Sequence, residues 1–200
     1  MTEWILLFVV CYAMGSIPTA YLLGKWLHGI DIRKVGYRNA GVANAWRQMS
    51  PRAGLLVLLI DAGKGMAAVT IARRMIPGDA SVILAGFAAV AGHNWPAFLK
   101  FHGGRGAATA MGVLSFVLPY ATLPLVAISL CTFWLTNRFL IAMLCLFVPL
   151  PFVAWYLHAP AHLVLFAFAL PIIVLASHLL SEHFWPEKPA EGASEATTSV

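Results

Sequence analysis

The chain of 200 residues is 60% hydrophobic and only 10% charged, with a formal net charge of +5 and a mean hydropathy of +0.81. A soluble domain is only about 45–50% apolar, so this composition excludes an ordinary soluble protein and requires a lipid environment. The three cysteines lack the paired spacing of zinc sites and redox motifs, so buried thiols are the simplest interpretation.

Apolar stretches recur along the chain, and a helix of about 18–20 such residues can cross the roughly 30 Å of bilayer hydrocarbon. The pattern predicts an all-α, polytopic membrane protein with about seven transmembrane helices, at 4–25, 53–74, 81–100, 105–119, 121–137, 139–157 and 161–183. The fourth and fifth spans are short, so we expect them to be tilted, partly re-entrant or shielded by neighbours. Residues 1–185 would form the membrane domain, and the polar tail 186–200 would be disordered.

Basic residues are concentrated on one predicted side of the membrane. They are Lys25, Arg33, Lys34, Arg38, Arg47, Arg52, Lys100, Arg105, Arg138 and Lys188. The opposite side has only Arg73 and Arg74. Because Lys and Arg are retained on the cytoplasmic side, this asymmetry predicts an N-terminus outside and a C-terminus in the cytoplasm.

The first span is interrupted by the polar stretch 15–21, which contains Ser16, Pro18 and Thr19. A proline kink is tolerated in a membrane helix when nearby hydroxyls satisfy the backbone groups that it frees. Such a kink and a functional site explain the stretch equally well.

Two basic segments that contain glycine, 31–47 and 91–109, also break the apolar pattern. In the first, Gly36 and Gly41 allow a concave array of amide donors, and arginines and asparagines add charge and hydrogen bonds, which suits a phosphate. In the second, the Gly-Gly-Arg-Gly turn at 103–106 opens an apolar helix, which places free amides and a guanidinium together. A loop that merely obeys the positive-inside rule or touches anionic lipid would explain the arginines, but not the glycines and asparagines.

Asp61 and Lys64 lie inside the second span, three residues apart, so their side chains can meet on one helix face. Pairing lowers the cost of placing charge in lipid, and it favours a structural ion pair over a catalytic acid or base. His93 and His178 differ from most other histidines because each lies in or near an apolar helix end predicted to face the cytoplasm.

Four blocks together resemble the bacterial acyl-phosphate-dependent glycerol-3-phosphate acyltransferases. They are GSIPTAYLLGK at 15–25, DIRKVGYRNAGVANAWR at 31–47, DAGKG at 61–65 and AGHNWPAFLKFHGGRGAAT at 91–109. The resemblance implies a seven-helix enzyme of the bacterial cytoplasmic membrane with its active site facing the cytoplasm. It would transfer an acyl group from an acyl phosphate to the 1-hydroxyl of glycerol 3-phosphate, giving lysophosphatidate and phosphate for phospholipid biosynthesis. The expected partners are these two substrates and membrane lipid, with no nucleic acid, cofactor or metal.

The resemblance also implies a set of site residues. His178 and Arg105 are the expected catalytic residues, and Arg105 stands where the family usually has lysine, which gives a wider, planar array of donors. The expected substrate-binding residues are Ser16, Gly36, Asn39, Gly41, Asn44, Arg47, His93, Gly103, Gly104, Gly106 and Thr109. For these residues to form one site, segments 36–47 and 103–106 must emerge on the same side of the membrane.

The chain departs from the family pattern in three places. The usual Gly-Ser-Gly-Asn is here 36–39, Gly-Tyr-Arg-Asn, whose bulky side chains would narrow a phosphate nest, and Ala43 replaces a threonine. Near the C-terminus, His178 matches a His-Arg-x-Asn-Ile-x-Arg pattern, but the asparagine and the following arginine are missing. The serine that usually follows the Arg-aromatic pair is also missing after Arg138 and Phe139.

The matching loops contain no convincing nucleophile motif, so we expect direct acyl transfer, with arginines and amides stabilising charge on the carbonyl and the leaving phosphate. Either His178 or a substrate phosphate would accept the proton. Two other hypotheses remain open from the sequence. One is an acyltransferase with another phosphorylated or polyol acceptor, and the other is a catalytically degenerate protein that binds anionic lipid or transports a substrate.

Overall fold

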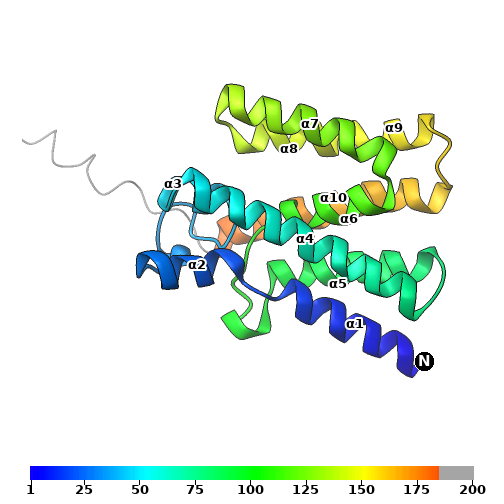
Figure 1. Ribbon diagram of the computed structural model, residues 1–200, viewed down its shortest axis with the longest axis horizontal. Coiled ribbons are helices and arrows are strands. Elements are labelled where there is room, and N and C mark those ends of the chain that lie inside the picture. The colour runs from blue at the N-terminus through cyan, green and yellow to red at the C-terminus, as the bar shows by residue number, and fades with distance from the viewer. Residues whose placement is uncertain (185–200) are drawn as a thin grey trace, which may run out of the picture.

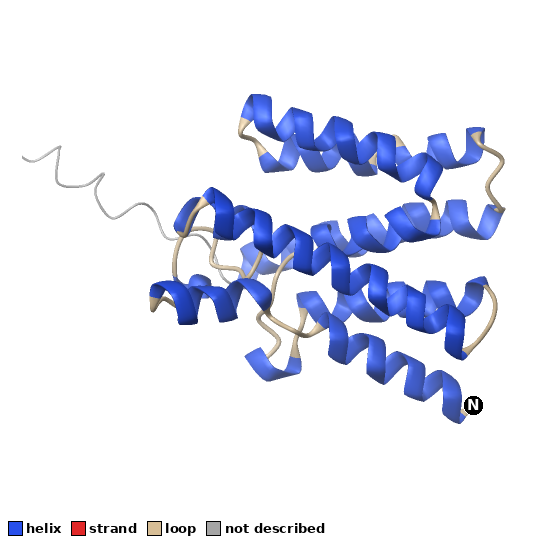
Figure 2. Ribbon diagram, viewed as in Figure 1, coloured by secondary structure: helices blue, strands red, loops and turns tan. Residues whose placement is uncertain are grey.

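The computed structural model describes residues 1–184, and within them every regular element is a helix (Figure 2). In chain order these are α1 (Thr2–Gly15), α2 (Thr19–His28), η1 (Ile32–Lys34), α3 (Val42–Gln48), α4 (Pro51–Met75), α5 (Asp79–Asn94), η2 (Ala97–Leu99), α6 (Ala107–Val117), α7 (Pro119–Thr136), α8 (Phe139–Phe147), α9 (Leu150–Tyr156) and α10 (Ala161–Phe184). The predicted all-α class is confirmed. The predicted tail 186–200 lies outside the described residues.

The structure confirms a count of about seven membrane helices. Six stretches are long and apolar enough to cross a bilayer, namely Thr2–His28, Pro51–Met75, Asp79–Leu99, Pro119–Thr136, Phe139–Tyr156 and Ala161–Leu180. The seventh, α6, has only 11 residues and rises about 16 Å. Almost all of α6 is buried by other helices, so shielding by neighbours explains why this span can be short.

Two of the spans are each built from two α-helices that meet at a proline. Pro18 separates α1 from α2, and Pro149 lies between α8 and α9. Proline has no backbone N–H and clashes with the preceding turn, so a helix ends or bends there. At the first break the carbonyl of Ile17 accepts from Lys64 Nζ at 2.9 Å and from the amide of Thr19 at 3.1 Å.

Glycines allow the helices of one half of the molecule to pack closely. A Cβ atom at Gly15 would collide with the backbone of Ala89, and one at Gly112 would collide with the backbone of Ala62. In lipid, close contact between small residues is a main source of helix association. We call α1, α4, α5 and α6 the glycine-packed half, and α7 to α10 the C-terminal half. Figure 1 shows α7, α8 and α9 as a layer set apart from α1, α4 and α5.

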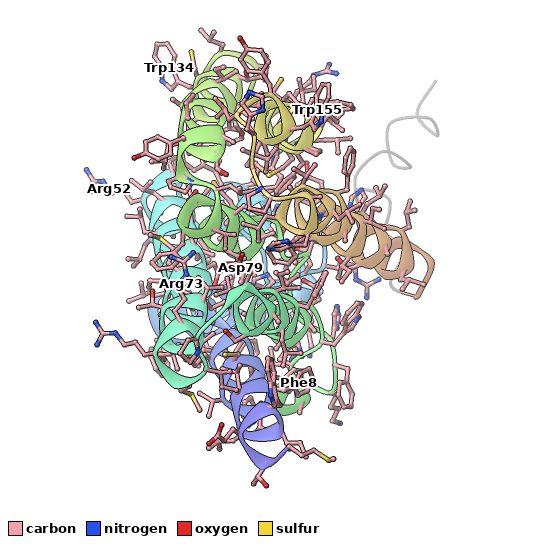
Figure 3. All side chains as sticks on the ribbon, turned by 90° about the vertical axis from the view of Figure 1, so that its right-hand side faces the viewer. Phe8, Arg52, Arg73, Asp79, Trp134 and Trp155 are labelled. Atoms are coloured by element: carbon pink, nitrogen blue, oxygen red, sulfur yellow. The ribbon has the colours of Figure 1, made fainter. Side chains whose placement is uncertain are left out.

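Exposed aromatic side chains mark both ends of the bundle. Trp26 and Trp134 lie near the end that carries the long loops, whereas Tyr120, Trp155 and Tyr156 lie near the other end. Trp134 and Trp155 project outward from the helices (Figure 3). Trp and Tyr are enriched at the two interfaces between membrane and water, so this distribution matches a protein that crosses the bilayer.

Candidate functional site

The two loops that contain the predicted phosphate-binding residues are joined by hydrogen bonds. The amide of Ala40 donates to the carbonyl of Gly103 at 3.0 Å, and Nε2 of His102 donates to the carbonyl of Arg38 at 2.8 Å. Segments 36–47 and 103–106 therefore emerge at the same end of the bundle, as a single site requires.

Asn44 organises the first loop from within. Its buried side-chain amide donates to the carbonyls of Ile32, Val35 and Asn39, at 2.8, 3.1 and 2.9 Å. Its side-chain oxygen accepts from the amide of Tyr37 at 3.0 Å. All the hydrogen-bonding capacity of this amide is therefore directed at the loop backbone. Asn44 holds the loop in shape and does not line the cavity described below.

The tight turn at 36–39 requires left-handed backbone. Gly36 has a φ of +54°, and Arg38 has a φ of +53°. Glycine adopts this conformation freely, whereas a residue with a side chain is strained there. A glycine at position 38, as in the pattern that the sequence resembles, would adopt this conformation without strain.

Two ionisable groups outside the membrane spans anchor the loops. Burial of Asp31 opposes its ionisation, but hydrogen bonds and charge from Arg33, at 3.0 Å, hold the pKa of this carboxyl below its usual range. Arg33 also donates to the carbonyl of Leu99 at 3.2 Å, which links the two loops. Burial lowers the pKa of His102, and the charge of Arg33 lowers it further, against the opposing effect of the hydrogen bond to Arg38.

A cavity of about 760 Å³ lies between these loops, α4, α5 and the C-terminal half. Its polar lining brings together residues from seven parts of the chain. They are Tyr37, Asn39, Arg47, Asp61, His93, Arg105, Arg138 and His178. Three guanidinium groups therefore face one hollow, an arrangement that favours anions such as phosphate.

Tyr37 lies between two of these arginines. Its ring centre is 5.1 Å from the guanidinium carbon of Arg47 and 5.9 Å from that of Arg105. Arg47 also donates to the carbonyl of Asn137 at 3.3 Å. Cation–π contact holds a guanidinium over a ring without occupying all its N–H donors. The tyrosine that replaces the family's serine thus supports both arginines.

A small part of the apolar cavity wall comes from Val42, Ala43, Ala107 and Ala108. The larger part comes from the C-terminal half. It includes Leu140, Ile141, Leu144, Phe147 and Phe152 on α8 and α9, and Phe168, Ile172 and Leu175 on α10. Ser177 donates to the carbonyl of Arg105 at 3.1 Å, which fixes the end of α10 beside the Gly-Gly-Arg-Gly turn. One hollow therefore joins a cationic wall to a hydrocarbon-like wall.

The structure divides the predicted site residues into two groups. Those that line the cavity are Asn39, Gly41, Arg47, His93, Arg105, Gly106 and His178. Those that lie outside its lining are Ser16, Gly36, Asn44, Gly103, Gly104 and Thr109. Several of the second group support the first. For example, a Cβ atom at Gly104 would collide with the ring of His93.

Three polar residues of the cavity lining were absent from the predicted set: Tyr37, Asp61 and Arg138. Tyr37 and Arg138 lie at or next to positions where the chain departs from the family pattern. Those positions were therefore interpreted as missing residues of the pattern and not as site residues of this chain. Asp61 forms the expected ion pair with Lys64 at 2.9 Å. Nothing in the spacing of that pair indicates that Asp61 also reaches a cavity.

Comparisons with known proteins agree over nearly the whole chain. Residues 5–181 match the family described as glycerol-3-phosphate acyltransferase. The chain is 41% identical over 165 residues to glycerol-3-phosphate acyltransferase 2 of Moorella thermoacetica, covering 82% of this chain and 84% of the relative. It is 42% identical over 154 residues to glycerol-3-phosphate acyltransferase 1 of Dehalococcoides mccartyi, covering 74% of each.

Solved structures give the same result. The crystal structure of PlsY (YgiH), an integral membrane glycerol 3-phosphate acyltransferase, in its glycerol 3-phosphate form has a TM-score of 0.80 and 26% identity. The match covers 97% of this chain and 98% of that one. The lysophosphatidic acid form of the same protein has a TM-score of 0.77 over 92% of this chain and 94% of that one.

Proposed function

The chain belongs to the glycerol-3-phosphate acyltransferase family of membrane enzymes, and from this premise we propose its donor, its site and its mechanism. The donor is an acyl phosphate, and the acyl group passes to the 1-hydroxyl of glycerol 3-phosphate. The products are lysophosphatidate and inorganic phosphate. The observation that carries this proposal is the single cavity, in which three arginines meet an apolar wall.

The two walls of the cavity fit the two parts of the substrates. Arg47, Arg105 and Arg138 offer positive charge and planar arrays of N–H donors to the phosphate groups. The wall formed by α8, α9 and α10 accepts an acyl chain that reaches the site from the bilayer. An acyl phosphate requires both environments at once, because its charged head and its hydrocarbon tail are joined at the reacting carbon.

The reaction is a displacement at that carbon. The 1-hydroxyl oxygen attacks the acyl carbonyl, a new ester bond forms, and the bond from the carbonyl carbon to the phosphate oxygen breaks. Arginine donors stabilise the negative charge that develops on the carbonyl oxygen and on the departing phosphate. The hydroxyl proton passes to His178, which lines the cavity, or to a substrate phosphate.

The cavity opens on the cytoplasmic side of the bacterial inner membrane. Support comes from the basic residues of both loops and from Arg138, which share one end of the bundle, whereas Arg73 and Arg74 end α4 at the other. A fluorescent protein that matures only in the cytoplasm, fused to the C-terminus, should fluoresce. A dark fusion alongside an active periplasmic reporter at the same position would reverse this orientation.

An assay of phosphate release tests the reaction. The purified protein in lipid should release phosphate from palmitoyl phosphate only when glycerol 3-phosphate is present, and lysophosphatidate should form in equal amount. A family enzyme assayed in parallel provides the positive control. Lack of acceptor-dependent release in this chain, while the control works, would contradict the proposed function.

A further inference from the structure

Asp61 is a buried acid that uses only half of its hydrogen-bonding capacity. Its side chain is 1% exposed. Oδ1 accepts from Thr19 Oγ1 at 2.8 Å and from Lys64 Nζ at 2.9 Å. Oδ2 accepts no hydrogen bond from any residue that the structure describes. Asp61 is also the one acidic residue in the cavity lining within residues 1–184.

No described neighbour can satisfy this oxygen as the side chains stand. Nδ1 of His93 lies 3.8 Å from Oδ2, which is beyond hydrogen-bond distance. A buried carboxylate oxygen that has lost its water and gained no donor destabilises the protein, so such atoms call for a specific explanation. Because Asp61 lines the cavity, a donor that enters the cavity can complete its hydrogen bonds.

The chemistry of the two substrates identifies that donor. Phosphate groups at neutral pH are anions that a carboxylate repels, and they fit the three arginines instead. An acyl chain has no hydrogen-bond donor. Among the groups that the two substrates carry, only the hydroxyls of the glycerol part can donate to Oδ2. The 1-hydroxyl must face the acyl carbon, which leaves the 2-hydroxyl.

We propose that Oδ2 of Asp61 accepts a hydrogen bond from the 2-hydroxyl of the acceptor, so that Asp61 makes the enzyme selective for a vicinal diol phosphate. This inference rests on the proposed function. Lys64 has two roles in it: it neutralises the carboxylate, which lets phosphates bind nearby, and it holds the α1–α2 break through the carbonyl of Ile17.

The test compares two acceptors and two double variants. Propane-1,3-diol monophosphate retains the phosphate and the reacting hydroxyl of glycerol 3-phosphate but lacks the 2-hydroxyl. The wild type should prefer glycerol 3-phosphate in kcat/KM by about tenfold or more, since a site built to bind a hydroxyl rejects an analogue that lacks it. Asp61→Ala/Lys64→Met removes both charges together and should reduce that preference to less than about threefold.

Two further variants separate recognition from structure. Asp61→Asn/Lys64→Met retains a side-chain oxygen at position 61 and should recover part of the preference. Asp79→Asn is the matched control, because Asp79 pairs with His162 at 2.7 Å and does not line the cavity; it should retain the full preference. The KM for palmitoyl phosphate should stay the same in all variants, and melting in detergent should confirm that they are folded.

Each outcome either supports or overturns the inference. A wild type that uses both acceptors equally overturns it even if the alanine variant does not fold. An undiminished preference in the folded alanine variant, or a loss confined to the KM for palmitoyl phosphate, overturns it as well. In both cases the proposed function survives. A wild type that transfers to neither acceptor overturns the proposed function and this inference together.

Discussion

The two halves of the molecule are packed in different ways. In the glycine-packed half, the helix backbones touch at Gly15 and Gly112, and the charged groups of Asp61 and Lys64 are buried in a defined contact. In the C-terminal half, large side chains such as Leu144 stay half exposed, and the helices leave the apolar wall of the cavity. The comparison teaches that rigid packing positions the polar chemistry, whereas looser packing leaves the apolar wall to which we assign the acyl chain.

The largest expected effect on activity is at Arg47 and Arg105, which lie at the cavity between the two halves. Arg47→Ala and Arg105→Ala should each lower kcat/KM by about a hundredfold or more, because the charge on the phosphates loses its donors in the cavity. Initial rates with palmitoyl phosphate provide the measurement. Arg52→Ala is the control, since Arg52 points away from the bundle (Figure 3) and should leave the rate unchanged. Equal rates in all three variants would remove the arginines from the site.

Adding a methyl group to a glycine should destabilise the glycine-packed half at a close helix contact but not at its exposed surface. Gly112→Ala should destabilise the protein by about 1–3 kcal/mol, since the added carbon meets the backbone of Ala62. Gly63→Ala adds the same group where no atom lies within 4 Å, and it should stabilise α4 slightly. Thermal unfolding in one detergent measures both. Similar melting temperatures for the two variants would show that the close contact at Gly112 does not limit the size of the side chain there.

A bulky residue in the C-terminal half should affect lipid binding and spare the fold. Leu144→Trp should lower kcat/KM for palmitoyl phosphate by about tenfold by filling the acyl wall, and should lower it less for octanoyl phosphate. Ile128→Trp is the control, because Ile128 is similarly exposed but does not line the cavity. A uniform loss at both chain lengths would contradict the assignment of this wall to the acyl chain.

The smallest expected effect concerns pH and the loops that join at the site. The pKa of His102 is lowered in the folded protein, so the unfolded chain binds more protons as pH falls below about 6.5. The free energy of unfolding should therefore decrease as pH falls through that value. His102→Gln retains a donor for the Arg38 carbonyl and should weaken this dependence. Unfolding curves at pH 7.5 and pH 5.5 provide the test, and parallel curves would contradict it.

Composition and span length sufficed to predict the helical class and about seven spans. The distribution of basic residues placed the two loops on one side of the membrane. The three-residue spacing predicted the Asp61–Lys64 pair, because spacing on a helix determines which side chains are adjacent. The apolar wall could not be predicted. Helices such as α8 and α10 are apolar on every side, so their sequences do not indicate which face packs and which lines a cavity.

The roles of the site residues could likewise be predicted only in part from the sequence. An asparagine in a glycine-rich loop suits either a phosphate or the backbone of the loop itself, and at Asn44 the structure shows the second role. The sequence also gives no sign that one oxygen of Asp61 is left over once its partners are counted. Whether this oxygen has a partner depends on the distances between α2, α4 and α5. Those distances are set by helix packing and cannot be inferred from the local sequence pattern.

The enclosed position of α6 has a consequence for how the protein is made. At about 16 Å, this helix covers only about half of the roughly 30 Å hydrocarbon layer. Alone in the bilayer, it would expose the unpaired backbone groups at its ends to hydrocarbon. Its walls include α4 and α5, which leave the ribosome before it does. When α6 enters the membrane, α4 and α5 are therefore already present to pack against it and shield it from lipid.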